Sequence, residues 1–156
     1  MTKPVFAYTT YIRTTPEKLW QALTTPEFTD QYWVPGIISD WKKGSRWEHK
    51  NDDGSVKIHG EVLESVPGKR LVLTWLGTAA PVEYSKVAFD IIPLEGAEGL
   101  VQLDVLHDGF SEGSVMAPRV ADGWPRVLSN LKSLLETGKT LINWGQFKSC
   151  TPPKAA

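Results

Sequence analysis

Residues 120–138, VADGWPRVLSNLKSLLETG, contain the pattern that decides the fold. Apolar side chains recur here at intervals of three and four residues, which predicts an amphipathic helix with one broad apolar face. The residues of this face are Val120, Trp124, Val127, Leu128, Leu131, Leu134 and Leu135. Gly138 follows where a glycine often caps the C-terminus of a helix. Pro125 must lie in the first turn or kink the helix, so the start of the helix stays open between Ser114 and Asp122.

The chain before this helix consists largely of strand-like runs separated by turn signals. Runs enriched in β-branched and aromatic residues predict strands, and Asp53-Gly54 and Pro67-Gly68 indicate tight turns. The expected strands cover residues 5–13, 37–38, 46–50, 56–64, 70–76, 84–92 and 100–107. Successive hairpins form an antiparallel sheet, and its apolar face needs a cover, which the C-terminal helix can provide.

Two short helices are expected after the first strand. The tripeptide Thr-Pro-Glu occurs at residues 15–17 and again at residues 25–27. Thr is a good N-cap, Pro suits the first helical position, and Glu suits the positive end of a helix. The sequence therefore predicts an α+β fold with a curved antiparallel sheet of six to seven strands. Two short helices follow its first strand, and the long C-terminal helix packs over it.

Two-residue turns at 53–54 and 67–68 would set the register of three strands. Trp47 then lies opposite Gly60, and Gly60 lies opposite Trp75. A glycine within a strand often marks a bend or a close approach, so we expect the sheet to cup inward around these two indoles. In the first hairpin the inward set is Trp47, His49, Val56, Ile58, Gly60 and Val62, and the outward set is Glu48, Lys50, Lys57, His59 and Glu61.

A helix over an apolar sheet face can enclose a small-molecule pocket, and seven tryptophans are available to line one. We expect Trp33, Trp47, Trp75 and Phe89 to form its walls, with His49 and His107 as its polar groups. The remaining expected ligand-binding residues are Ile58, Trp124 and Leu128. The alternative interpretation is a solid core with the two histidines at its rim.

Composition excludes several classes of protein. The net charge of −1 lacks the basic excess that binding to nucleic acid requires. One cysteine, Cys150, leaves no disulfide framework, and three histidines without close spacing indicate no metal site. No apolar run reaches the length of a membrane span. We expect one cytoplasmic domain over residues 1–156, with its core at about 5–138, a weakly ordered tail at 147–156, and no cofactor.

Four segments resemble those of a known family. They are RTTPEKLW at 13–20, GEVLE at 60–64, RLVLTW at 70–75 and GWPRVLSNLKSLLE at 123–136. Over residues 5–138 the chain resembles homologues of the C-terminal domain of the activator of the heat-shock-protein-90 ATPase. These belong to the START and birch-pollen-allergen (SRPBCC) superfamily, which implies a helix-grip fold with an apolar cavity. The segment KGSR at 43–46 departs from the paired glycines that often stand there in this family.

The resemblance leaves three kinds of function open, because a shared fold does not choose among them. We expect binding of a small hydrophobic or aromatic ligand. The alternative is a co-chaperone-like role with a chaperone as partner, which would use exposed apolar residues such as Trp41 and Leu63. The third is a reaction of the polyketide cyclase or aromatase type. It would use His107 as a weak candidate for acid–base catalysis, helped by His49, Tyr84 and Arg119.

Overall fold

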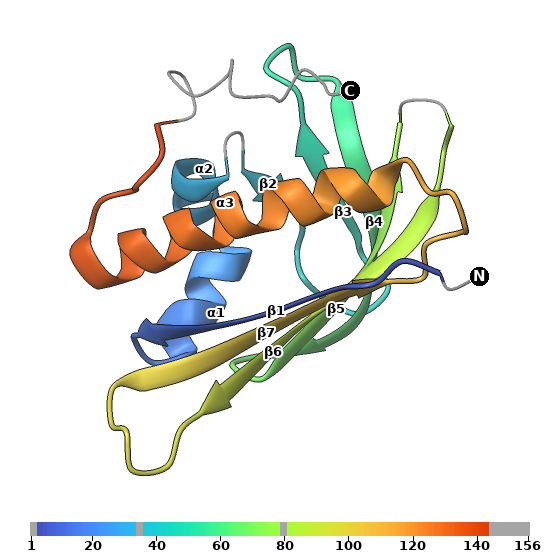
Figure 1. The fold of residues 1–156 in the computed structure, drawn as a ribbon. Helices are drawn as coiled ribbons and strands as arrows, with labels where there is room; N and C mark the ends of the chain where they lie inside the picture. The colour runs from blue at the N-terminus through green and yellow to red at the C-terminus, as the bar shows by residue number, and fades with distance from the viewer. Residues whose placement is uncertain (1–2, 34–35, 79–80, 144–156) are drawn as a thin grey trace.

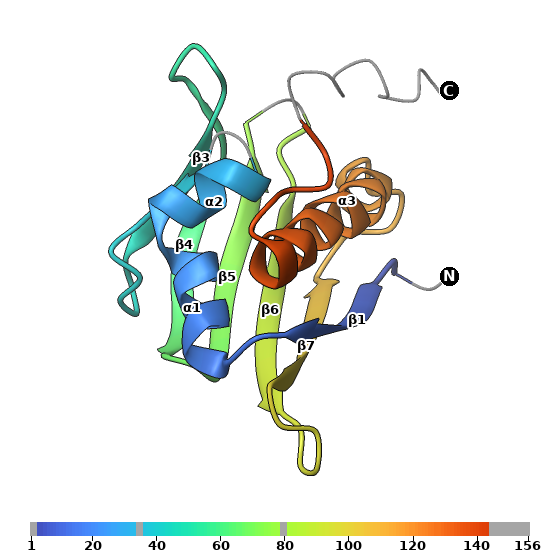
Figure 2. The ribbon, with the colours of Figure 1, turned by 90° about the vertical axis from the view of Figure 1, so that its left-hand side faces the viewer.

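Within the described residues, seven antiparallel strands form one curved sheet, and three helices lie against its concave face (Figures 1 and 2). The computed structural model describes residues 3–33, 36–78 and 81–143. The elements are β1 (Phe6–Arg13), α1 (Pro16–Thr24), α2 (Pro26–Tyr32), β2 (Ile37–Ile38), β3 (Arg46–Lys50), β4 (Val56–Val66), β5 (Arg70–Gly77), β6 (Tyr84–Pro93), β7 (Leu100–Asp108) and α3 (Met116–Thr137). The predicted α+β helix-grip architecture is confirmed.

The order of the strands explains why the helices lie on one side. Across the sheet the order is β1-β7-β6-β5-β4-β3-β2, so β1 pairs with β7, the last strand in the chain. α1 and α2 carry the chain from the β1 edge to the β2 edge over the concave face, and α3 then crosses the same face (Figure 2). The core therefore lies between the sheet and these helices.

Both short helices begin directly after the predicted threonines, but only one threonine side chain acts as a cap. The Thr15 hydroxyl accepts the backbone N–H of Lys18 at 3.2 Å. Thr25 occupies the same position before α2, yet its side chain makes no capping hydrogen bond. The Thr-Pro-Glu repeat thus predicts both helix starts, while the expected cap forms only at α1.

α3 begins near the early end of the range that the sequence left open, between Ser114 and Asp122. It begins at Met116, so Pro125 lies inside the helix, beyond its first turn. Gly138 ends it as predicted, with a φ of 80°, and its N–H donates to the carbonyl oxygen of Leu134 at 2.9 Å. No described helix is both long enough and apolar enough to cross a membrane. Cys150 and the tail at 147–156 lie outside the described residues.

The hairpin between β3 and β4 differs from the prediction by one residue. Its loop contains three residues, 52–54, rather than two. A β-bulge at Lys57 absorbs the additional residue, so Trp47 still lies opposite Gly60 as predicted. From the bulge to the loop, the residues of β4 lie on the opposite face from the one expected. Val56 therefore moves to the outer face, and Lys57 borders the interior cavity, contrary to the expected sets.

The next hairpin repeats this compensation. Its loop also has three residues, 67–69, because Val66 pairs with Arg70. The extra residue is Leu63, which forms a second bulge, and Val62 consequently lies opposite Leu73 as predicted.

Gly60 permits the close approach that its place in the strand predicts. A Cβ atom at this position would lie 2.0 Å from the carbonyl oxygen of Thr74 and 2.6 Å from Nε1 of Trp47. The Trp47 N–H donates to that same carbonyl oxygen at 2.8 Å. Only glycine leaves room for this hydrogen bond between an indole and the neighbouring strand.

Candidate functional site

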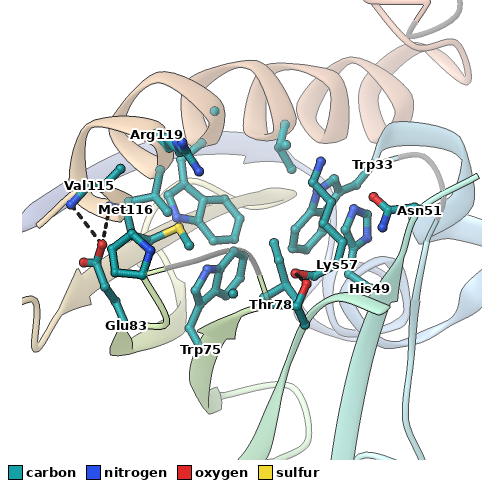
Figure 3. Close-up of a pocket in the computed structure, with 17 residues that line it drawn as sticks. Trp33, His49, Asn51, Lys57, Trp75, Thr78, Glu83, Val115, Met116 and Arg119 are labelled. Carbon is teal, nitrogen blue, oxygen red and sulfur yellow. Dashed lines mark hydrogen bonds between the residues drawn. The ribbon is translucent and has the colours of Figure 1, made fainter. Parts of the chain in front are cut away.

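A cavity of about 470 Å³ lies between the N-terminal half of α3 and the strands β4 and β5 (Figure 3). Its apolar lining includes Trp33, Ile58, Trp75, Met116, Val120, Trp124 and Val127. Its polar side chains are His49, Asn51, Lys57, Thr78, Glu83 and Arg119. This volume and this mixture of apolar walls with a few polar groups are typical of small-molecule sites.

Three indoles from distant parts of the chain line the cavity together. Trp33 follows α2, Trp75 lies in β5, and Trp124 projects from α3. The rings of Trp33 and Trp75 are nearly parallel, with centroids 5.8 Å apart and planes 7° apart. Trp124 is tilted against both, at 5.4 Å and 5.5 Å. The three rings thus pack against one another and present aromatic surface to the cavity.

The structure brings five of the nine expected ligand-binding residues to the cavity. These are Trp33, His49, Ile58, Trp75 and Trp124. The other four lie elsewhere in the interior. Phe89 and Leu128 line a crevice of only about 10 Å³ that shares Trp33 and Trp124 with the cavity. Trp47 is fully buried and packs against Trp75 with centroids 5.2 Å apart, and His107 is fully buried as well.

His107 is held between two hydrogen-bond partners. Trp124 Nε1–H donates to His107 Nδ1 at 3.0 Å, and His107 Nε2 lies 2.8 Å from Ser85 Oγ. An indole nitrogen is only a donor, so Nδ1 must be unprotonated and the neutral ring carries its proton on Nε2. Nε2–H then donates to Ser85. Burial lowers the pKa of His107 to about 3, so the ring is neutral at pH 7. Both of its nitrogens are engaged within the protein.

His49 lies at the cavity and is also neutral. Its ring stacks on Trp33 with centroids 4.8 Å apart and is only 2% exposed. Burial, together with the charge of Lys57, lowers the pKa of His49 to about 4, whereas a backbone hydrogen bond at Gly36 acts in the opposite direction. Nδ1 of His49 has no hydrogen-bond partner among the described residues. His49 therefore contributes a polar but uncharged group to the lining.

Glu83 joins the strand side of the cavity to α3. One carboxylate oxygen accepts the N–H groups of Val115 and Met116 at 3.0 Å and 3.2 Å (Figure 3), and the other bonds the Ser114 hydroxyl. The Ser114 hydrogen bond, followed by the two backbone bonds, lowers the pKa of this carboxyl below its usual range. An anion at the positive end of a helix is stabilising. No local sequence signal predicts this contact, because Glu83 lies more than thirty residues before the helix that it caps.

Several polar and apolar residues named from the sequence lie in other places. Arg119 lines the cavity, but Tyr84 is 52% exposed at the start of β6. Trp41 and Leu63 are half-buried rather than exposed, and Trp41 packs against the core. Leu63 is the residue of the second bulge. The expected exposed apolar pair is therefore corrected.

The chain is similar to one known family and to several solved structures. Residues 13–136 match the family described as Activator of Hsp90 ATPase homolog 1-like protein. The search of curated proteins found no match. The solved structure of MLL2253 from Mesorhizobium loti is 28% identical, with a TM-score of 0.73 over 84% of this chain and 96% of that one.

Two further solved structures share the fold at lower identity. Aha1 from Colwellia psychrerythraea, solved as a dimer, is 22% identical, with a TM-score of 0.71 over 89% of this chain and 99% of its own. The HSP90 activator PFC0360w from Plasmodium falciparum is 21% identical, with a TM-score of 0.70 over 85% of this chain and 96% of its own. Because the family match covers well over half of the chain, this protein belongs to the family of Activator of Hsp90 ATPase homolog 1-like proteins.

Proposed function

We propose that this protein binds a small, mostly apolar aromatic molecule in the cavity beneath α3. The observation that supports the proposal best is the nearly parallel pair of Trp33 and Trp75 beside about 470 Å³ of open space. A filled interior would instead have favoured a purely structural role for these rings. Each aromatic contact of a bound ring with an indole contributes about 0.5–1.5 kcal/mol beyond the burial of its area.

Gly123 provides a direct way to test this proposal. It lines the cavity from α3, and a Cβ atom added there would meet no atom within 4 Å. We therefore expect the larger side chain of Gly123→Phe to fill part of the cavity. Gly123→Ala is the matched control, because it adds one methyl group and should stabilise the helix by up to about 1 kcal/mol.

The experiment is a tryptophan fluorescence titration with flavonoids, sterols, fatty acids and aromatic polyketides. We expect at least one of the aromatic compounds, the flavonoids or the polyketides, to give a saturable change in the wild type and in Gly123→Ala. The change should be lost in Gly123→Phe, whose fold is checked by circular dichroism. A flat response of the wild type across the panel, or equal binding by all three proteins, would contradict the proposal.

The family match supports a second candidate, which is binding to an Hsp90-type chaperone. This role would use the outer surface of the domain rather than the cavity. Stimulation of Hsp90 ATPase activity by the wild type and by Gly123→Phe distinguishes the two functions. Equal stimulation by both proteins would support a chaperone role that does not depend on the cavity, and no stimulation by either would remove this candidate.

A further inference from the structure

The charged groups at the cavity do not balance. Among its described lining residues, Lys57 and Arg119 are cationic, Glu83 is the single carboxylate, and His49 is neutral. Both oxygens of Glu83 are already committed to the N-terminus of α3. The charge of Arg119 also helps to lower the pKa of Glu83, so Glu83 offsets part of the positive charge and the described lining keeps a net charge of +1.

The two cations lie on opposite walls of the cavity. Lys57 reaches it from the bulge in β4, and Arg119 reaches it from α3 (Figure 3). Neither takes part in the salt bridges found in the described part of the chain. Lys57 adds to the effect of burial in lowering the pKa of His49, which lines the same cavity. A positive potential beside low-dielectric walls attracts and orients an anion.

From this arrangement we infer that the cavity selects a flat aromatic molecule that carries an anionic group. The aromatic body lies against Trp33 and Trp75, and the anionic group lies between Lys57 and Arg119. A carboxylate, a sulfonate and an ionised phenol share this chemistry. The inference rests on the proposed function and adds the charge of the ligand to it.

Two fluorescent probes that differ mainly in charge test the inference. Anilinonaphthalene sulfonate is an anion, whereas N-phenylnaphthylamine has a similar aromatic body without the charge. We expect the wild type to bind the sulfonate more tightly, and added salt to weaken the binding of the sulfonate alone. Lys57→Gln combined with Arg119→Gln should lower the affinity for the sulfonate about tenfold and leave that for the neutral probe within about twofold. Lys43→Gln, outside the lining, is the control for a general loss of positive charge.

The outcomes separate this inference from the proposed function. If Gly123→Phe abolishes the binding of both probes but the double variant leaves the sulfonate affinity unchanged, the cavity binds ligands and the anionic preference is wrong. The preference is also wrong if the double variant weakens both probes equally, or if Lys43→Gln has the same effect. If neither probe shows saturable binding that Gly123→Phe removes, the proposed function fails and the inference fails with it.

Discussion

Lowering the pH from 7 to 5 should remove about 4 kcal/mol from the free energy of unfolding, mostly through His49 and His107. Burial lowers the pKa of His107 to about 3 and, with Lys57, that of His49 to about 4. In the unfolded chain both return to the ordinary value of about 6.5. Between its folded pKa and about pH 6.5, each histidine therefore binds fewer protons in the folded state than in the unfolded state. The stabilisation is fully present above pH 6.5 or so and is lost as the pH falls toward the folded pKa.

The magnitude of the loss follows from the width of the pH range in which each histidine is protonated in the unfolded chain but neutral in the folded protein. Each unit corresponds to about 1.4 kcal/mol for each group. From about pH 6.5 to pH 5 this gives roughly 2 kcal/mol for each histidine. For His107 the physical cause is specific, because protonation of Nδ1 would place an N–H against the N–H of Trp124. That arrangement would replace a hydrogen bond by two opposed donors.

Urea unfolding at pH 7 and pH 5 and constant ionic strength measures this loss. We expect a loss of about 4 kcal/mol in the wild type and about 2 kcal/mol in either His107→Gln or His49→Gln. His59→Gln is the matched control, because His59 lies on the outer face of β4 and the variant should behave as the wild type does. A loss in His107→Gln as large as that in the wild type would refute the reasoning, since it would mean that His107 does not stay neutral in the fold.

Two further substitutions test the packing around the cavity. Gly60→Ala should destabilise the protein by about 3 kcal/mol or more, because the added Cβ atom would lie 2.0 Å from the carbonyl oxygen of Thr74 and force β4 and β5 apart. A wild-type midpoint in chemical denaturation would contradict this close approach. Asn130→Ala should cost roughly 2 kcal/mol, because the buried Asn130 amide donates to the carbonyl oxygen of Ile142 at 3.0 Å and accepts the N–H of Ile142 in return. Amide exchange at Ile142 should accelerate in this variant, and unchanged protection would show that the two bonds do not hold this segment.

Most of the fold can be predicted from local patterns, because helix starts, helix faces and strand faces each depend on residues that are close together in the sequence. The apolar spacing of residues 120–138 predicts α3, and the Thr-Pro-Glu repeat predicts the starts of α1 and α2. The alternation of side chains in strands predicts that Trp47, His49 and Trp75 face inward. These predictions hold even though both loops differ by one residue from the expected turns, because a bulge restores the register in each hairpin.

The site is harder to predict because it depends on how deeply each inward-facing side chain is buried. The side of the sheet on which a side chain lies does not reveal this depth. Trp75 and His107 both point to the concave side, yet Trp75 lines the cavity while His107 is fully buried outside its lining. Periodicity cannot distinguish these depths, since it reports only the side of the sheet. Lys57 shows the same limit in another form, because the bulge that brings it to the cavity leaves no local mark in the sequence.

The order of the elements, most of the inward-facing positions and the family resemblance all follow from sequence patterns, and the match over residues 13–136 supports that resemblance. Which inward side chains border open space depends on the packing of the elements in three dimensions. Trp33, Trp75 and Trp124 come from three separate elements, and their spacing depends on how α2 and α3 pack over the sheet. Hydrophobic burial drives these side chains inward but is non-directional, so the position of a cavity depends on the packing of the whole chain.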